Sequence, residues 1–234
     1  MARQPLKLLH STIRRYRLFE PGEPVIVAVS GGADSLCLLQ ILADYNQRQQ
    51  QGWRLLAVHV VPGFPDWPVK RIEHQFQRLG TEYEIVRADV PERIRHFGEN
   101  PCYVCSRERR KQLFELARRR GIRKIALAHH LEDVNETYLL NLLYSASART
   151  FVPRQEFFGG KVEFIRPLYE FDKPAFMKYL RSRGLKVVRT PCPYAVRGRR
   201  EEVRRFLNRL YKRYPRIRQN LFTGIRNVKA QYLP

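Results

Sequence analysis

The sequence is poor in cysteine and has no long hydrophobic run. Only four of its 234 residues are cysteines, Cys37, Cys102, Cys105 and Cys192, too few for a disulfide framework in a chain this long. No apolar run approaches the roughly 20 residues that cross a bilayer, and the basic start lacks the apolar core of a secretory signal. We interpret that start as an amphipathic helix. We expect a cytoplasmic protein with no membrane partner, in which paired cysteines point to a metal site or to catalysis.

Acidic residues are scarce relative to basic ones. The chain has 22 Asp and Glu against 44 Lys and Arg, a formal net charge of +22. From residue 171 onward, 18 basic residues meet three acids, so this segment alone carries +15. A solvated protein surface normally mixes the two signs, so the imbalance predicts a polyanionic partner. An anionic membrane surface is the weaker alternative.

Apolar runs alternate with amphipathic stretches through the first 170 residues. We expect strands at 25–30, 54–61, 82–90, 124–129 and 163–168, with helices between them at 35–50, 68–79, 106–120 and 131–145. Near-continuous apolar strands in this rhythm predict an α/β fold, a Rossmann-like doubly wound parallel sheet covered on both faces. Further helices fit 173–183, 199–213 and 217–229. The expected organisation is an α/β domain with an N-terminal helix over residues 1–170, and a basic helical C-terminal region over 171–234 packed on it.

The first expected strand runs into the sequence SGGADS at residues 30–35. A strand, a tight Gly-Gly turn and a helix start place free backbone N–H groups at the positive end of a helix dipole, which favours anion binding. Gly31 and Gly32 let the backbone approach an oxyanion closely, and the flanking serines add hydroxyl donors. A plain strand-to-helix turn capped by Asp34 or Ser35 is the alternative, since glycine pairs after strands are common.

A second motif follows another expected strand. The segment KIALAHHLEDVNETYLLNLLY, residues 124–144, places His129, His130 and Asp133 at the carboxyl end of that strand, where open α/β sheets bind ligands. Lone histidines at such a place are more often structural. SGGADS resembles the SGGxDS signature of the PP-loop ATP pyrophosphatases, and residues 124–144 resemble the strand–HHxxD–helix of the tRNA-modifying members of that family.

The resemblance implies an adenine nucleotide alpha hydrolase-like fold and an enzyme that splits ATP between its α and β phosphates to adenylylate a substrate. It also implies the ATP-binding residues: Ser30, Gly31, Gly32, Ala33, Asp34 and Ser35 in the loop, together with His59, His129 and His130. Mg²⁺ is expected near Asp34, with Asp133 as the second metal or phosphate ligand. Both carboxylates are expected to be catalytic.

Within that family the chain resembles the iron–sulfur branch, typified by tRNA 2-thiocytidine synthetase, over nearly its whole length. The shared stretches occur in family order: PGFP (62–65), PCYVCSRERR (101–110), IRPLYE (165–170), TPCP (190–193) and KRYPRIRQNLFTGIRNV (212–228). In this branch sulfur replaces oxygen on the adenylylated base. The resemblance implies that Cys102, Cys105 and Cys192 are catalytic and hold a [4Fe–4S] cluster.

Taken by themselves, the cysteines leave other uses open. A [4Fe–4S] cluster held by three thiolates leaves one iron open for a further ligand. Zinc normally takes a fourth Cys or His to close its site, and Cys37, inside the first long helix after the loop, is expected to be a core residue. A redox pair formed by Cys102 and Cys105 would leave Cys192 without a role.

Several features depart from the thiocytidine pattern. The phosphate loop carries Ala33 where those enzymes usually have Lys, and Tyr194 stands where they have a second late cysteine. The stretch HHLEDVNET, with Glu136 and Thr137, is closer to the tRNA lysidine synthetases, in which free lysine attacks the base. The second expected strand also lacks the acidic residue often found near the adenine pocket. The motifs therefore support the branch but not the identity of the modified nucleotide.

The expected function is that of an ATP-dependent tRNA sulfurtransferase that adenylylates a pyrimidine carbonyl and replaces its oxygen with sulfur, with 2-thiocytidine as the first choice of product. The sulfur would come from a donor such as a cysteine desulfurase or free sulfide, and a homodimer is left open. The alternatives are a tRNA lysidine synthetase-type enzyme and an ATP-regulated RNA-binding module. The three cysteines count against the first alternative, and the paired SGGADS and HHLED motifs count against the second.

The tRNA partner is expected to meet the basic segments of the chain, including the arginine-rich helix after PCYVC. The leading RNA-binding candidates are Arg197, Arg199, Arg200, Arg204 and Arg205. Aromatic residues lie among these charges, and Tyr194, Phe206 and Tyr211 are candidates to stack an unpaired base. For Phe206 we favour a place in the helix core instead.

Overall fold

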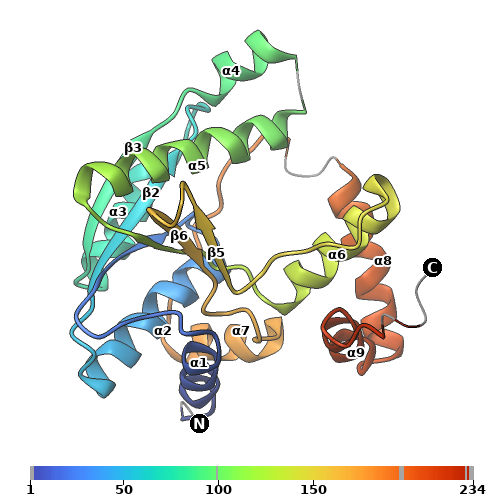
Figure 1. Ribbon diagram of the computed structural model, residues 1–234. Coiled ribbons are helices and arrows are strands. Elements are labelled where there is room, and N and C mark those ends of the chain that lie inside the picture. Colours follow the sequence, from blue (N-terminus) through green and yellow to red (C-terminus); the bar gives the residue numbers. More distant parts are fainter. Residues whose placement is uncertain (1–2, 99, 195–197, 230, 232–234) are drawn as a thin grey trace.

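The computed structural model describes residues 3–98, 100–194, 198–229 and 231 (Figure 1). The strands are β1 (Pro24–Ala28), β2 (Arg54–Val61), β3 (Glu82–Arg87), β4 (Lys124–Ala126), β5 (Arg154–Phe157) and β6 (Val162–Ile165). The helices are α1 (Arg3–Tyr16), α2 (Ala33–Gln49), α3 (Val69–Arg78), α4 (Val90–Phe97), α5 (Pro101–Arg120), α6 (Leu131–Ser145), α7 (Lys173–Ser182), α8 (Arg199–Arg213) and α9 (Ile217–Gly224).

The six strands form one sheet in the order β3-β2-β1-β4-β6-β5. The first five strands of this order are parallel, whereas β5 pairs antiparallel with β6 at one edge. β1 lies inside the sheet, because Val25 is aligned with Leu55 of β2 on one side and with Lys124 of β4 on the other. The predicted parallel α/β sheet is confirmed, and the antiparallel edge strand is an addition that the sequence analysis missed.

The side chains of β1 alternate between two hydrophobic cores. Val25 and Val27 belong to a core shared with α1, α2, α3 and α7, whereas Ile26 belongs to a second core shared with α5 and the β5–β6 hairpin. Successive residues of a strand face opposite sides of a sheet. A strand covered on both faces is therefore apolar throughout, which explains why the strands were visible in the sequence as continuous hydrophobic runs.

Three helices differ from expectation. α5 begins at Pro101 rather than at 106, so the cysteine pair lies inside its first turns. α4 was not predicted, although Asp89 caps it by accepting a hydrogen bond from the N–H of Glu92. α7 lies in the segment assigned to the C-terminal region, yet its Phe176 is fully buried in the first core.

The last two helices pack on α6 rather than on the sheet (Figure 1). Leu207 and Tyr211 of α8 form a small core with Leu139 of α6. Phe222 of α9 packs in another small core with Leu131, at the start of α6. In the part of the chain described, no helix combines the length and the apolar character needed to span a membrane.

Candidate active site and cysteine site

The loop that joins β1 to α2 is closed by its own serines. Ser35 Oγ accepts a hydrogen bond from the backbone N–H of Ser30 (3.1 Å) and donates one to the carbonyl of Gly32 (3.0 Å). α2 begins at Ala33, with Gly32 as an N-cap that has no side chain to offer. Neither Asp34 nor Ser35 is therefore the N-cap that the alternative of a plain turn required. Instead, the loop is a hydrogen-bonded ring at the positive end of the α2 dipole.

The two glycines of this loop differ in backbone conformation and in the space around them. Gly31 has a φ of +88°, and a Cβ there would lie 3.2 Å from Cδ1 of Ile72, so the backbone itself requires glycine. Gly32 has an ordinary φ of −72°. A Cβ on Gly32 would meet only Ser30 Oγ, at 3.4 Å. The space beside Gly32 is therefore largely open, which an approaching phosphate requires.

His130 lies at the centre of a cluster of acidic residues beside the loop. Its Nδ1 is 3.0 Å from Oε2 of Glu132, and its Nε2 is 3.4 Å from Oδ2 of Asp133 and 3.7 Å from Oδ2 of Asp34. Burial alone would lower the pKa of His130, but the hydrogen bonds and charges of the carboxylates raise it to about 10. The His130 ring is therefore a fixed cation at neutral pH.

One carboxylate oxygen of Asp34 has no hydrogen-bond partner among the residues that the structure describes. Burial acts to raise the pKa of Asp34, but the hydrogen bond and charge of His130 outweigh it, so the pKa is lowered. Oδ1 of Asp34 is buried and has no hydrogen-bond partner within the described residues, which is costly for a charged group. Mg²⁺ prefers carboxylate oxygens, so this oxygen, next to a phosphate loop, fits such an ion.

Asp133 and His129 lie at the start of α6. Asp133 Oδ2 accepts a hydrogen bond from the backbone N–H of His130 (3.1 Å) and so caps the helix. His129 Nδ1 accepts a hydrogen bond from Nε of Arg166 (3.3 Å), and its ring stacks on Phe151 with centroids 4.2 Å apart. Burial, followed by the charge of Arg166, lowers the pKa of His129 to about 3. His129 is therefore neutral, with its proton on Nε2.

Arg166 is a site residue that the sequence analysis did not single out, although it lies within IRPLYE. Its guanidinium is buried, and burial lowers its pKa to about 10. Besides His129, it donates hydrogen bonds to the carbonyl of Val152 (2.6 Å) and to Oε1 of Gln155 (3.2 Å). The available signal was an arginine at the end of a buried strand, where a charged group needs several partners.

His59 supports the loop from within the sheet. The side chain is fully buried in β2, with Nδ1 2.7 Å from the carbonyl oxygen of Val29 and Nε2 2.9 Å from Nε1 of Trp67. A carbonyl only accepts and an indole N–H only donates, so Nδ1 carries the proton. Burial lowers the pKa of His59 to about 4. Because both ring nitrogens are engaged by the protein, the structure places His59 behind the phosphate loop and not against a nucleotide.

The cysteine pair occupies the start of α5. Asn100 caps this helix by accepting hydrogen bonds from the N–H groups of Cys102 (3.0 Å) and Tyr103 (3.4 Å). Cys102 is exposed, and Cys105 is half-buried. Burial raises the pKa of both thiols, and Cys192 is close enough to raise both further. The structure therefore places Cys192 near the Cys102–Cys105 pair, although the two segments are far apart in the sequence.

The segment that carries Cys192 also reaches the phosphate loop. The N–H of Val188 donates a hydrogen bond to the carbonyl of Gly31 (3.0 Å). Six residues later, the ring of Tyr194 packs against Phe64, with centroids 6.1 Å apart, beside the second core that Cys105 also contacts. One short segment thus connects the phosphate loop with the cysteine pair.

The donor set at the cysteine site fits an iron–sulfur cluster better than zinc. A structural zinc site is normally closed by four Cys or His ligands, whereas three thiolates can hold a four-iron cluster that keeps one iron open. Among the described residues, no group of three Cys, His, Asp or Glu side chains is arranged to hold a metal ion, so the three thiols do not form a finished site. Cys37 is a core residue, as predicted, fully buried with Sγ 3.6 Å from the carbonyl oxygen of Phe176.

Two of the predicted RNA-binding arginines instead attach α8 to α6. Arg204 forms two hydrogen bonds to the carboxylate of buried Glu136, at 3.0 and 3.1 Å. Arg200 donates to Oγ1 of Thr137 at 3.2 Å. Such two-point arginine–carboxylate contacts fix orientation as well as distance. Glu136 and Thr137, the pair noted in the sequence, therefore position the basic C-terminal helices.

Of the other predicted arginines, Arg199 and Arg205 remain available for a polyanion. The Arg199 guanidinium lies over the ring of Tyr144, 4.7 Å from its centroid. Arg205 pairs with Glu201 of its own helix (3.2 Å) and is 63% exposed. Arg197 lies outside the described residues.

Of the aromatic candidates on α8, Tyr211 is buried and Phe206 is exposed, which the sequence analysis did not predict. The expectation that Phe206 lies in the helix core is wrong, because 46% of it is exposed. Val203, Leu207 and Tyr211 form the buried face of α8, at the spacing of one helix stripe. Phe206 falls one position off that stripe and so faces outward.

Comparisons with known proteins agree with this geometry. A family model described as PP-loop domain matches residues 4–211. The tRNA-cytidine(32) 2-sulfurtransferase of Syntrophotalea carbinolica is 32% identical over 97% of this chain and 90% of its own length. That of Dechloromonas aromatica is 33% identical over 93% of this chain and 77% of its own.

A solved structure supports the fold at lower sequence identity. The U34-tRNA thiolase NcsA from Methanococcus maripaludis, determined with its [4Fe-4S] cluster, matches 100% of this chain and 80% of that chain, with a TM-score of 0.78 and 21% identity. The phosphate loop, the α6 start and the late cysteine segment all lie within the part of the chain that these relatives share. The chain therefore belongs to the PP-loop domain family, in the group of the tRNA-cytidine(32) 2-sulfurtransferases.

Proposed function

We propose that the protein is an ATP-dependent tRNA sulfurtransferase that makes 2-thiocytidine. In this reaction ATP is split into AMP and pyrophosphate, and the O2 oxygen of a tRNA cytidine is replaced by sulfur. The observation that carries the proposal is the segment from Val188 to Tyr194, which connects an ATP-type phosphate loop to three thiols. The relatives are named for cytidine 32, and we infer the same position here.

The phosphate loop is the part of the chain that would hold the phosphates of ATP. Its N–H groups lie at the positive end of α2, and the space beside Gly32 is largely open. Asp34, through its unpartnered Oδ1, would hold Mg²⁺, which offsets negative charge on the phosphates when bound. The neighbouring His130 cation keeps Asp34 ionised, because it lowers the pKa of that carboxyl against the effect of burial.

Adenylylation turns the cytidine oxygen into a leaving group. O2 attacks the α-phosphorus of ATP, an O–P bond forms, and the bond from that phosphorus to the bridging oxygen breaks as pyrophosphate leaves. His130 contributes a fixed positive charge and not a proton, because its pKa is about 10. His129, neutral and protonated on Nε2, is the histidine that can donate a hydrogen bond to an incoming oxygen.

The three cysteines would hold a [4Fe–4S] cluster. When bound, a cluster held by three thiolates has one iron with an open position that can carry sulfur. Burial raises the pKa of Cys105, and the charge of Arg109 counteracts this effect and so favours the thiolate that iron needs. In the substitution a C–S bond forms at C2, the C–O bond breaks, and AMP leaves with the former O2 oxygen. The proposed sulfur donor is a cysteine desulfurase or free sulfide.

The tRNA would lie against the basic C-terminal helices. Arg205 and the exposed Phe206 lie off the buried face of α8, and Arg199 lies over Tyr144 of α6. All three can meet phosphates or an unpaired base. The division of labour between an ATP-binding domain over residues 1–170 and an RNA-binding region over 171–234 is part of this proposal. α7 is the element the two would share, because it packs in the first core.

Nucleoside analysis tests the proposal. tRNA from cells with and without the gene is digested, and we expect 2-thiocytidine only where the protein is present. Cells that carry Asp34→Asn should resemble cells without the gene. Cells that carry Arg48→Gln, at an exposed position near the far end of α2, should keep the nucleoside. Loss of lysidine would favour the lysidine synthetase-type alternative, and unchanged nucleosides would refute the proposal.

A further inference from the structure

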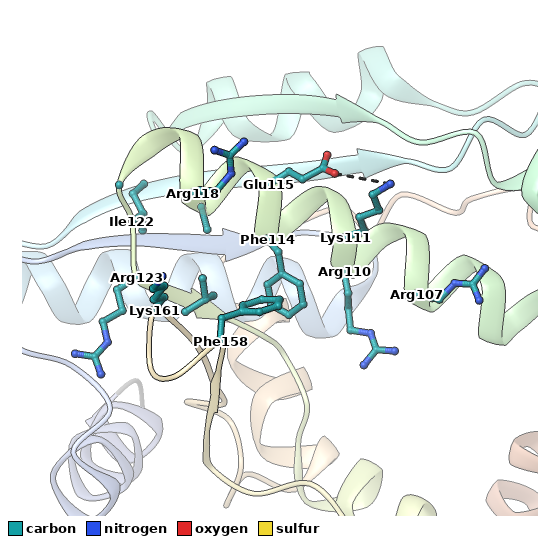
Figure 2. Close-up of a pocket in the computed structure, with 13 residues that line it drawn as sticks. Arg107, Arg110, Lys111, Phe114, Glu115, Arg118, Ile122, Arg123, Phe158 and Lys161 are labelled. Atoms are coloured by element: carbon teal, nitrogen blue, oxygen red, sulfur yellow. Dashed lines mark ion pairs between the residues drawn. The ribbon is translucent and has the colours of Figure 1, made fainter.

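An open groove of about 820 Å³ runs between α5 and the β5–β6 hairpin (Figure 2). We call it the α5 groove and define it by six of its lining residues: Arg110, Lys111, Phe114, Arg118, Phe158 and Lys161. Its floor is aromatic, where the rings of Phe114 and Phe158 lie against each other, and its rim is basic. None of the residues assigned above to ATP or to the cysteine site lines it.

The floor of the groove includes the ring of Phe158, which is largely exposed although it contacts Phe114. Phe114 packs on Phe157 and Phe164, with ring centroids 5.1 and 4.9 Å apart. Phe158 contacts Phe114 edge-on at 5.2 Å but is 63% exposed. Its φ is +55°, a left-handed conformation that a bulky residue rarely adopts. The turn between β5 and β6 accounts for this conformation, and it leaves a large apolar ring exposed beside the groove, as at many ligand-binding surfaces.

The rim of the groove has more basic side chains than acids to pair with them. Lys111 pairs with Glu115 at 3.8 Å, the contact marked in Figure 2. Arg110, Arg118 and Lys161 have no acidic partner within the described ranges. Cations of one sign around a concave surface raise the local concentration of anions, so the occupant of the groove should be negatively charged.

The combination of charge and aromatic surface favours RNA as the occupant. A second copy of this chain would bring the same basic rim to the contact, and like charges facing each other are unfavourable. RNA offers phosphates to the rim and flat bases to the floor. Basic grooves with aromatic rings on which bases stack are the usual way in which proteins bind single-stranded nucleic acid.

The groove is continuous with the surface around the cysteine pair. Cys105 and Arg118 lie on the same helix, 13 residues apart, which corresponds to about 20 Å along its axis. Near the cysteines, Tyr103 is 53% exposed, and the Arg107 guanidinium lies 5.7 Å from its ring centroid and 4.7 Å from that of Phe97. Basic and aromatic side chains thus continue from the cysteine site to the groove, a distance that a few nucleotides span.

We infer that the α5 groove binds an unpaired stretch of tRNA next to the reacting cytidine. One base stacks on Phe158, and the flanking phosphates lie against Arg110, Arg118 and Lys161. The inference rests on the proposed function, because it takes the bound RNA to be the substrate. An acidic segment of a partner protein is the competing occupant, and the experiment below separates the two.

Binding of fluorescently labelled, unmodified tRNA transcript to the iron-loaded protein tests the floor of the groove. Phe158→Leu keeps an apolar side chain but removes the ring, and we expect binding to weaken about tenfold. Phe158→Trp keeps a ring and should bind as tightly as the parent protein. An apolar contact with a peptide would tolerate leucine, so equal binding by the Leu variant and the parent would count against RNA.

Substitutions on the rim test the phosphate contacts. The double variant Arg118→Gln/Lys161→Gln should reduce the slope of log affinity against log salt by about 1.4, because each lost contact to single-stranded RNA removes about 0.7. The matched control is Arg48→Gln/Arg78→Gln, which removes two exposed cations at the far ends of α2 and α3. The control should leave the slope nearly unchanged, and equal slopes for both double variants would overturn the inference.

Photochemical cross-linking identifies the occupant without turnover. Irradiation of the protein–tRNA complex should link RNA to the peptide that contains Phe158, and Phe158→Leu should lose this link. No link at this peptide, or protection of the groove only by an acidic protein, would overturn the inference. If RNA binds in the groove but 2-thiocytidine is still made in cells without the gene, the proposed function fails while the RNA site stands. If 2-thiocytidine is lost in those cells but no RNA binds in the groove, only this inference fails.

Discussion

The phosphate loop and the cysteine site are connected by one segment but are held together differently. The loop is closed by hydrogen bonds of its own serines, Ser30 and Ser35, and is supported from behind by His59. The cysteine site has three free thiols. Its parts come from the start of α5 and from the segment around Cys192, and burial keeps the pKa of Cys102 and Cys105 raised.

This difference shows which of the two sites needs a ligand to be complete. A loop closed by its own serine hydroxyls keeps its shape with or without a phosphate, because those hydrogen bonds do not depend on a ligand. Thiols with raised pKa values must lose protons to bind iron, so the free energy of metal binding also orders the segments that carry them. We therefore expect changes at the phosphate loop to affect chemistry first, and changes at the cysteines to affect cofactor content first.

The largest expected effect is at the cysteines. Replacing Cys102, Cys105 or Cys192 by Ala should abolish the iron and sulfide content and the formation of thionucleoside, while ATP binding is kept. Cys37→Ala should keep the cluster, because its thiol is buried in the first core. Iron and sulfide analysis with visible spectra, on protein purified without air, measures this. Stoichiometric zinc in place of iron would contradict the cluster, and loss of iron in Cys37→Ala would contradict the ligand set.

At the phosphate loop, Asp34→Asn removes the charge at the unpartnered oxygen. We expect tRNA-dependent AMP formation to fall by about 10²–10³-fold. The melting temperature and iron content should stay close to those of the parent, because the serines and not Asp34 close the loop. AMP and ADP are separated by chromatography. Release of ADP by the parent protein would contradict cleavage between the α and β phosphates. Loss of iron in the variant would show that the phosphate loop also controls cofactor content.

The cysteine site is expected to depend on α8, the helix that follows Cys192 in the chain. Arg204→Met leaves the buried carboxylate of Glu136 without its main partner, and we expect a loss of about 2 kcal/mol of stability and a lower iron content. Arg205→Met, at a side chain 63% exposed on the same helix, should change stability by less than about 0.5 kcal/mol. Urea unfolding measures both variants. Equal stabilities would mean that the contact between α8 and α6 does not hold the C-terminal helices.

Substitutions of the two loop glycines are expected to have different effects, Gly31→Ala on stability and Gly32→Ala on ATP binding. Gly31→Ala forces a side chain into a φ of +88° and against Ile72, so we expect a loss of about 1–3 kcal/mol of stability. Gly32→Ala should cost less than about 1 kcal/mol but weaken ATP binding strongly, because the methyl group occupies the open space at this position. Thermal unfolding and calorimetric ATP titration measure the two effects. Tight ATP binding by Gly32→Ala would argue against a phosphate at this place.

Burial of His59 behind the loop makes the stability of the protein depend on pH. The pKa of His59 is about 4 in the folded protein, below its ordinary value of 6.5. Because the folded-state pKa is the lower one, the unfolded chain binds more protons between these values. Stability therefore falls as pH drops from about 6.5 toward 4, by up to about 1.4 kcal/mol per pH unit, and His129 adds a contribution of the same sign.

The variant His59→Asn should show a shallower fall in stability below pH 6.5. At pH 7.5, where the histidine is neutral in both states, the variant should differ from the parent only by its lost hydrogen bonds, about 1–2 kcal/mol. Urea unfolding at several pH values measures both quantities. Parallel pH profiles for the two proteins would show that His59 does not carry this dependence.

Where sequence predictions succeeded, the signal was local. β2, α6 and α8 have the predicted bounds, 54–61, 131–145 and 199–213, because long apolar or amphipathic patterns specify the period of an element directly. α4 was missed because its eight residues carry a single buried apolar position, Val90. β5 was missed because an edge strand with polar residues resembles a loop.

By itself, the sequence determined the class of fold, the phosphate loop, the set of cysteines and the strongly basic charge, because each rests on residue types at short spacings or on composition. Only the tertiary structure decided how those residues are used. His59 became a support because a carbonyl and an indole from other segments engage both of its nitrogens. Arg204 became an anchor because a buried carboxylate lies opposite it, while Phe206 and Phe158 were left exposed. Burial and pairing depend on neighbours far apart in the chain, so no local pattern of residues specifies them.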